Sequence, residues 1–521
     1  MPTTVTISIG SRTSDSVTVS TVTATTVTGF SNAWSVVLSA SVPSTTKIGD
    51  KLTTGANSYL ITGISGSTLT VVGDASAAFT STTDPATGAA TTSRSFATIN
   101  TWTSGSPANL VTKDWIWKGE LYQEGGGTNG EWTFSLDNST SATCDSTRYF
   151  LLTAAPGQSF RDSANKLTNA LRYNTANGVA INSNGSYARL FSLSGSALAT
   201  ISNIQINRTT TNGFLFIGSV TVKSCIIKAM SVINHVSGNI YNSVIYTSSI
   251  VAGVTPTGWS GQLINNTFYY TGPSVTAVNF GNYSGTTSII RNNTFFGFAA
   301  ICNRFDRMNT AASTNNITNL ASFGWTATGN LVSKTAANQF SSLLPGLEDF
   351  RIKVNADVIN AGVRNQTYTN DLDIVGTTRS LTTPTIGAWE YPPITYARPA
   401  SDITTQWTAS TPGAAHYTMI NETTYNDTNY IYSTAASQVD EVKLQTMSAP
   451  ATGTDITINY RIQGITSGAA VTVYLYSGTT LIKTDVTRNS DSATFYTMTV
   501  TPSEWVFVTD WTNMRLRFVS S

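Results

Sequence analysis

Short runs of alternating apolar and polar residues, separated by glycine, asparagine, serine and proline, recur along the whole chain. No long stretch repeats apolar residues at the three- and four-residue spacing of an amphipathic helix. Near the N-terminus, residues 17–19, 34–38 and 68–72 have the composition of short strands. The pattern therefore predicts an all-β protein.

Shifts in composition predict the domain boundaries. Residues 1–75 are expected to form a small N-terminal β-domain that attaches the protein to a larger particle. Residues 76–94 are rich in alanine, serine and threonine, which is typical of a linker. Pro392 and Pro393 mark a second boundary, because proline cannot donate a hydrogen bond to a strand ladder. Beyond them, residues 395–521 alternate cleanly and are predicted to form a β-sandwich.

A six-residue unit, apolar-x-Asn/Ser-x-x-apolar, recurs in the central region at intervals of roughly 20 to 25 residues. Its copies cover residues 201–206, 222–227, 240–245, 263–268 and 290–295, with a weaker copy at 327–332. Such a period is typical of the stacked coils of a parallel β-helix. We expect third-position amides such as those of Asn265 and Asn292 to form a hydrogen-bonded ladder between coils. The alternative is a β-sandwich whose strands share turn residues.

Three parts of the central region resemble known sequences. The segments Asn-Asn-Thr-Phe at 265–268 and 292–295 look like the repeats of right-handed parallel β-helix proteins. Residues 95–102 and 149–157 are similar to the segments that begin such helices. The most specific resemblance is to the terminal segment that closes many of them, at residues 358–362, 371–379 and 386–391. The resemblance implies a right-handed parallel β-helix over residues 95–391.

The C-terminal region carries a weaker resemblance. Residues 429–433, 458–462 and 514–518 look like the jelly-roll-type β-sandwich found near the ends of bacteriophage virion proteins. Together the resemblances imply a virion protein, either a tail fibre or tailspike or a capsid decoration. They also imply a homotrimer, contacts with other virion proteins, and exposure on the particle exterior to host cell-surface glycan.

Composition excludes two classes of partner. Only 11% of the residues are charged, and 29 basic residues against 28 acidic ones give a net charge of +1. We therefore expect neither nucleic-acid binding nor binding to an anionic membrane surface. No apolar run approaches the roughly 20 residues of a membrane span, so membrane insertion is not expected. The first residues lack the features of a secretory leader, so we expect assembly in a host cytoplasm.

Candidate catalytic chemistry is sparse. Glycoside hydrolysis normally needs two carboxylates roughly 5 to 9.5 Å apart. Between residues 163 and 347 the sequence contains one acidic residue, Asp306. Three distant cysteines without a CxxC pair are expected to be buried thiols, and the histidines, His235 and His416, lie in different predicted domains. We therefore predict no catalytic residues, no metal site and no cofactor. A polysaccharide depolymerase with an intersubunit site is the alternative, and a surface adhesin is a third hypothesis.

Three groups of residues are candidates for ligand binding. Aromatic rings next to carboxylates can bind sugar, which selects Trp115, Trp117, Tyr122 and Trp132 near Glu120. Their alternative role is to cover the open first coil. The charged segment 303–307 adds Arg304, Asp306 and Arg307, which could instead form a salt-bridged loop tip. Asp371, Asp373 and Glu390 could bind a cation or belong to a solvated loop.

Overall fold

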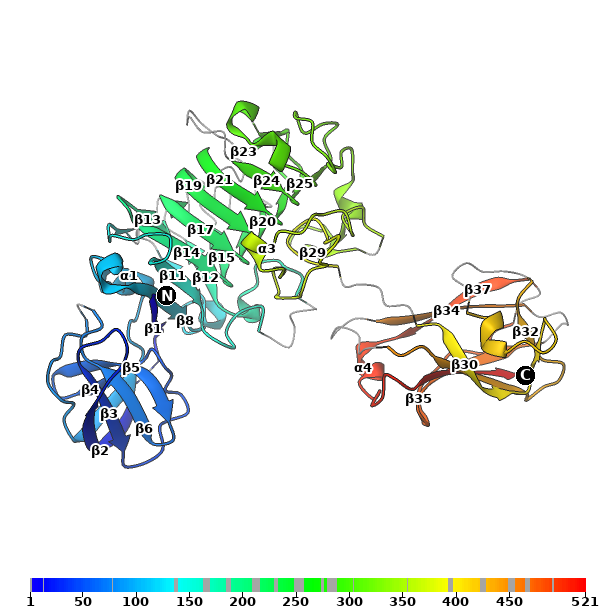
Figure 1. Cartoon of the computed structure of the whole chain (residues 1–521), viewed down its shortest axis with the longest axis horizontal. Helices are drawn as coiled ribbons and strands as arrows, with labels where there is room; N and C mark the ends of the chain where they lie inside the picture. Colours follow the sequence, from blue (N-terminus) through cyan, green and yellow to red (C-terminus); the bar gives the residue numbers. More distant parts are fainter. Residues whose placement is uncertain are drawn as a thin grey trace. The chain divides into compact units, whose positions relative to one another are not determined.

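The computed structural model divides into two compact units, Met1–Tyr391 and Pro392–Ser521. Both are built predominantly of strands, as the alternating pattern predicted (Figure 1). The structure describes residues 2–12, 14–76, 78–134, 139–162, 169–183, 189–208, 216–228, 233–247, 257–272, 276–278, 288–302, 304–353, 355–391, 397–421, 428–447, 455–463, 469–489 and 492–521.

Two large parallel sheets dominate the first unit (Figure 1). The first contains β1 (Thr3–Ile9), β8 (Trp115–Leu121), β11 (Phe150–Ala154), β14 (Leu198–Ser202), β17 (Ser219–Lys223), β19 (Ile233–Tyr241), β21 (Thr257–Ile264) and β24 (Ile289–Arg291). The second contains β9 (Trp132–Phe134), β12 (Ala180–Ser183), β15 (Gln205–Arg208), β18 (Ile226–Lys228), β20 (Val244–Thr247), β22 (Thr267–Tyr270), β25 (Thr294–Phe296) and β27 (Ile317–Thr318).

A third row of parallel strands is formed by β10 (Ser139–Thr140), β13 (Phe191–Leu193) and β16 (Phe216–Ile217), and it continues into the start of β19. Successive strands visit the three rows in turn, so that β11, β12 and β13 are followed by β14, β15 and β16. A further parallel pair is formed by β23 (Thr276–Val278) and β26 (Ala300–Cys302). Each turn of the chain therefore stacks on the one before it.

The predicted six-residue unit coincides with this stacking. Its first positions pair from strand to strand in the first sheet, in the order Ile201, Val222, Ile240, Leu263 and Ile290. Its sixth positions pair in the second sheet, in the order Ile206, Ile227, Ile245, Phe268 and Phe295. All ten side chains are buried in one core cluster. The Phe268 and Phe295 rings stack 4.9 Å apart, close to the spacing of neighbouring strands.

The third position of each unit turns the chain from the first sheet to the second. Residues there adopt a left-handed conformation, with φ between 48° and 60° at Asn203, Ser224, Asn242, Asn265 and Asn292. Asparagine adopts this left-handed conformation more readily than most residues, because its short polar side chain can hydrogen-bond to the nearby backbone. The weaker copy at 327–332 follows the same rule, with Gly329 at φ 72°.

The side-chain ladder lies one position later than predicted. The backbone N–H of Asn266 donates to Asn293 Oδ1 at 2.9 Å, and that of Asn293 donates to Asn316 Oδ1 at 3.0 Å. Asn316 donates in the same way to Asn330 Oδ1 at 2.9 Å. The expectation that Asn265 and Asn292 form this ladder is therefore wrong, because the left-handed turn places their side chains elsewhere.

Several third-position asparagines instead bind the segment that follows the stack. Asn292 Nδ2 donates to the carbonyl of Val363, and the Val363 N–H donates back to Asn292 Oδ1. Asn242 Nδ2 donates to the carbonyl of Leu372 at 2.6 Å. A further unit lies at residues 313–318, where Thr318 pairs with Phe295 and the third residue, Asn315, has φ 55°. Asn315 Nδ2 donates to the carbonyl of Ala361 at 2.8 Å. These bonds hold residues 361–372 against the edge of the stack at which the chain turns from the first sheet to the second.

Residues 340–389 cover the outer face of the second sheet. They include the antiparallel pair β28 (Phe340–Ser342) and β29 (Asp349–Ile352), and the short helix α3 (Gln366–Thr369). Phe350 packs against Tyr246 with a ring separation of 4.9 Å, and the Ala388 N–H donates to Thr267 Oγ1. A separate core cluster joins this segment to outward residues of the sheet. The predicted closing segment thus lies along the side of the stack.

A closed antiparallel barrel precedes the stack in sequence. Its strands are β2 (Asp15–Thr25), β3 (Ala33–Leu38), β4 (Lys51–Thr54), β5 (Asn57–Ser65), β6 (Thr68–Val72) and β7 (Gly88–Ser93). The linker prediction for residues 76–94 needs correction, because β7 pairs with both β2 and β4 and closes the barrel. The predicted start of this domain at residue 1 also needs correction. The first strand, β1, belongs to the parallel sheet and not to the barrel, because it pairs with β8. Both differences come from pairing partners far away in sequence.

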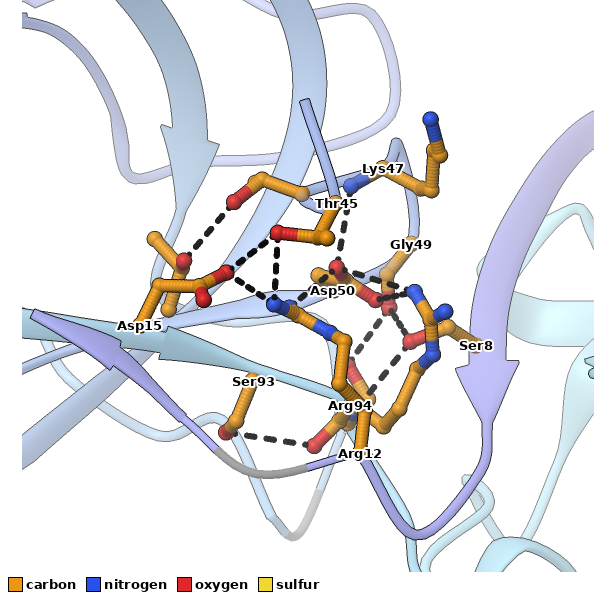
Figure 2. Close-up of polar contacts among 12 residues, drawn as sticks. Ser8, Arg12, Asp15, Thr45, Lys47, Gly49, Asp50, Ser93 and Arg94 are labelled. Atoms are coloured by element: carbon orange, nitrogen blue, oxygen red, sulfur yellow. Dashed lines mark hydrogen bonds and ion pairs between the residues drawn. The ribbon is translucent and has the colours of Figure 1, made fainter. Parts of the chain in front are cut away.

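Ion pairs and hydrogen bonds join the barrel to the first parallel sheet (Figure 2). Arg94 Nη1 lies 3.0 Å from Asp50 Oδ1, and the Asp50 side chain is fully buried. Arg94 Nη2 also pairs with Glu124, while its guanidinium lies 3.5 Å from the centre of the Tyr122 ring. The hydroxyl of Ser8 on β1 donates to the Gly49 carbonyl of the barrel. The barrel is therefore bonded to the stack by more than its connecting chain.

The second unit contains an antiparallel sheet in the order β30 (Pro399–Thr405), β33 (Val439–Leu444), β38 (Met514–Ser520), β35 (Val471–Ser477) and β36 (Thr480–Thr484). Two further antiparallel pairs are β34 (Ile456–Ile462) with β37 (Thr494–Val500), and β31 (Thr408–Ala409) with β32 (Ile431–Tyr432). Val442 and Val473 from the sheet share a core with Met498 and Val500 from β37. The short helix α4 (Pro502–Trp505) follows β37.

Candidate functional site

The structure places the four aromatic candidates of residues 115–132 in the interior. Trp115 and Trp117 on β8 are 1% and 0% exposed, and Tyr122 and Trp132 are each 7% exposed. Trp132 Nε1 donates to the Tyr122 carbonyl at 2.7 Å. A sugar can stack only on a ring face that reaches the surface. The proposed sugar-binding role of these four residues is therefore wrong, and their rings belong to the core.

The carboxylates of the same segment are bound within the protein. Glu120 accepts a hydrogen bond from Lys118 Nζ at 2.6 Å, and Asp114 pairs with Arg148 at 2.7 Å. Glu124 pairs with Arg94 at 2.5 Å. Each of these acids has a cation as its partner. The segment thus stabilises the start of the stack near α1 (Ile99–Ser104) and α2 (Leu110–Lys113).

The charged segment at 304–307 forms the salt-bridged loop that was the alternative to ligand binding. Arg304 holds both carboxylate oxygens of Asp306, with Nε and Nη2 each 2.9 Å away. Arg307 Nε lies 3.2 Å from Asp306 Oδ2. The hydrogen bonds from Arg304 lower the pKa of Asp306 to about 2. Such a carboxyl is ionised at neutral pH and is poorly suited to act as a general acid.

Two aromatic rings lie beside this loop. Phe305 is 36% exposed, and its ring centre lies 5.9 Å from that of the half-buried Trp325. Trp325 Nε1 donates to the Ser313 carbonyl at 3.0 Å, which orients the indole. Gly324, at φ 83°, lies close against the Phe305 ring, where a Cβ atom would collide with it. We call Arg304, Phe305, Asp306, Arg307 and Trp325 the 304–325 cluster.

The charges of this cluster stand out in the sequence, but its rings do not. The segment Phe-Gly-Trp at 323–325 was a usable signal, because a glycine between aromatic residues permits a tight turn. Nothing in the sequence placed that turn beside residue 305. Chemically, the cluster combines ring surface with planar charged groups that can hydrogen-bond hydroxyls. This combination is suited to binding sugar.

We expect the pKa of Asp306 to be about 2 in the intact protein. Because the folded pKa lies below the ordinary value of 3.8, the pairing stabilises the loop at pH values above about 4 and is lost as the pH falls through about 2. In Arg304→Gln the pKa should return towards 3.8. Carbon-13 NMR of aspartate-labelled protein measures both values, and Lys334→Gln is a control that leaves the loop unchanged. A wild-type pKa near 3.8 would contradict the bidentate pairing.

The carboxylates near the end of the first unit are also bound internally. Asp373 is fully buried, and Oδ1 accepts hydrogen bonds from the N–H groups of Val375 and Thr377. Glu390 pairs with the buried guanidinium of Arg379, and Asp371 pairs with Arg364. Within the described ranges, no three His, Cys, Asp or Glu side chains gather as metal ligands.

The described histidine side chain, that of His416, is buried, and so are the three cysteines. His416 Nδ1 lies 2.5 Å from Asp440 Oδ2 in the second unit, and both side chains are buried. The side chain of His235 lies outside the described residues. Cys144, Cys225 and Cys302 are buried free thiols, as expected. Burial raises the pKa of Cys302 to about 12, so this thiol is protonated at neutral pH.

Comparison of the chain with family models, curated proteins and solved structures returned no match. Among the described helices, none is both long and apolar enough to cross a membrane.

Proposed function

We propose that this protein is a non-enzymatic structural component of a bacteriophage virion, either a tail fibre or tailspike or a capsid decoration. In this proposal, the parallel strands of residues 95–391 form a right-handed parallel β-helix, and residues 395–521 form a jelly-roll-type β-sandwich. The N-terminal barrel contacts other virion proteins, and the 304–325 cluster contacts host cell-surface glycan on the particle exterior. The virion assignment rests on the sequence resemblances described above.

The state of Asp306 is the observation that carries the non-enzymatic part of the proposal. It is the one acidic residue between positions 163 and 347, and both of its carboxylate oxygens are bound by arginine side chains. A glycosidase needs a second carboxylate roughly 5 to 9.5 Å away and one carboxyl that is protonated. A carboxylate held by Arg304 and Arg307 is suited to orienting a sugar hydroxyl instead.

The stacked strands support a role as a stiff scaffold. Each interior residue repeats in register on the next strand, so the chain builds a continuous core along the stack. The outward positions of the first sheet include uncharged polar residues such as Thr200, Thr221 and Gln262. They also include charged residues such as Lys118 and Lys223.

The test uses purified protein and surface polysaccharide from a host that the protein is found to bind. We expect binding without any decrease in polymer size, measured by light scattering after chromatography over several hours. Phe305→Ala should weaken binding about tenfold if its ring stacks on a sugar. Tyr430→Ala, an exposed ring in the second unit, is the matched control. Steady shortening of the polymer would overturn the proposal and indicate a depolymerase.

The proposed assembly is a homotrimer, which is a common state of elongated β-helix spikes. Light scattering of the purified protein should then give three times the chain mass of 55.4 kDa. A monomer at the same concentration would contradict the trimer while leaving the glycan-binding test intact.

A further inference from the structure

The charges of this chain are unevenly distributed along its sequence. Residues 163–391, which contain most of the stacked strands and the segment that covers the second sheet, include 14 basic and 7 acidic residues. Residues 1–162 include 8 basic and 11 acidic residues, and residues 392–521 include 7 basic and 10 acidic ones. The central part therefore carries a net charge of +7, and each flanking part carries −3. Such an asymmetry favours an acidic partner for the central part.

The 304–325 cluster carries part of this positive charge. Arg304 and Arg307 both contact the carboxylate of Asp306, so two cations share one anion. The sequence has no other acidic residue between positions 163 and 347, and the strands from β21 to β27 lie inside this range. Asp306 raises the pKa of Arg304 through hydrogen bonds and charge attraction. The cluster therefore has a net charge of +1.

Several N–H groups of the two arginines are not used by these contacts. Arg304 binds Asp306 through Nε and Nη2, and its Nη1 has no hydrogen-bond partner in the described part of the chain. Arg307 contacts Asp306 with Nε, and its terminal nitrogens have no hydrogen-bond partner among the described residues. The Arg304 side chain is 38% exposed and that of Arg307 is 21% exposed, so both reach solvent. A guanidinium with unused N–H groups can bind a further carboxylate.

An aromatic surface accompanies these donors. Phe305 stands between Arg304 and Asp306 in the chain, and its partly exposed ring packs against Trp325. An acidic sugar combines a pyranose face with a carboxylate, so one residue of it can contact both the Phe305 ring and an arginine. Nucleic acids usually need phosphate contacts from many basic residues, whereas this cluster offers two. The cluster therefore fits an acidic sugar better than a nucleic acid.

We propose that the glycan bound by the 304–325 cluster is acidic, with a carboxylate that pairs with Arg307 and Arg304 and a pyranose ring that stacks on Phe305. This inference rests on the proposed function, because it names the chemical class of the glycan at the same site. Asp306 stays in place and orients the two guanidinium groups. The net charge of residues 163–391 attracts an acidic polymer at long range, which speeds association at low ionic strength.

Calorimetry on the full chain tests the inference with two forms of one polymer. Polygalacturonate carries a carboxylate on each sugar, and its methyl ester has the same backbone without the charge. We expect polygalacturonate to bind about tenfold more tightly than the ester, and its affinity to fall as the ionic strength rises. Arg307→Gln should weaken binding of polygalacturonate about tenfold and leave binding of the ester unchanged. Arg364→Gln is the matched control, because Arg364 is similarly exposed but is paired with its own carboxylate, Asp371.

The outcomes separate the inference from the proposed function. A preference for polygalacturonate that is lost in Arg307→Gln and kept in Arg364→Gln supports an acidic glycan. Equal binding of both polymers, weakened in each case by Phe305→Ala, overturns the inference and leaves the proposed glycan contact intact. Binding of neither polymer also overturns it, whereas the host polysaccharide still tests the glycan contact separately. Tighter binding of single-stranded DNA than of polygalacturonate, with the same loss in Arg307→Gln, overturns the inference in favour of a nucleic acid. The melting temperature of Arg307→Gln shows that lost binding is not lost folding.

Discussion

Replacing Asn293 with alanine is expected to lower the free energy of unfolding by about 4 kcal/mol. The side chain is fully buried, and Nδ2 donates to the carbonyls of Leu263 and Arg291. Its Oδ1 accepts from both the backbone and side-chain N–H groups of Asn266. Alanine removes all four of these hydrogen bonds and leaves the buried Asn266 N–H without its acceptor, so the ladder is broken in its middle. Urea unfolding followed by circular dichroism measures the loss.

Asn265→Gly is the matched control for this change. It removes the same amide from the same stack, but Asn265 has a left-handed φ of 57°, which glycine adopts without strain. Asn265 Oδ1 is buried without a hydrogen bond, so little polar bonding is lost. We expect a loss of less than about 1 kcal/mol. Equal losses in Asn293→Ala and Asn265→Gly would contradict the position of the ladder.

Replacing Arg379 with methionine is expected to lower the free energy of unfolding by about 3 to 5 kcal/mol. Arg379 is buried and pairs with Glu390 at 3.1 Å. Its Nη2 donates to the carbonyls of Gly387 and Ala388 and to Asn242 Oδ1 of the stack. Methionine fills much of the volume but leaves the Glu390 carboxylate buried without a cation. Chemical unfolding measures the loss.

Hydrogen exchange locates the effect of Arg379→Met. Amides of residues 372–388 should exchange faster, because this segment covers the second sheet and loses its main polar anchor. Amides of the Asn266 ladder should change less. Arg364→Met is the control, since Arg364 pairs with Asp371 at the surface and should cost less than about 1 kcal/mol. Uniformly faster exchange across the stack would show that residues 372–388 do not detach as a unit.

The repeat was readable from the sequence because it arises from local rules. Alternation within a short strand decides which side chains face the core, and this pattern identified Ile201 and Ile206 as interior positions. The turn between them needs a residue that tolerates positive φ, which explains the asparagine or serine at position three. The copy at 313–318 does not show the pattern, because Ser313 and Thr318 stand where the other copies have apolar residues.

Other features were predicted wrongly or missed because they depend on distant partners. The linker at 76–94 contains β7, whose strand character appears only when β2 and β4 lie beside it. Trp115 and Trp117 looked like ligand-binding rings, yet β1 and β11 enclose their strand on both sides. Phe305 and Trp325 are twenty residues apart and form one surface only because the chain folds back.

The sequence by itself determined the strand-rich class, the position of the repeats, and the scarcity of carboxylates in the central region. These properties follow from composition and from spacing along the chain, which folding does not alter. Only the tertiary structure decided which of two adjacent asparagines enters the ladder, which aromatic rings are buried, and which cation pairs with each buried carboxylate. The reason is that burial and charge pairing depend on neighbours brought together from distant parts of the chain.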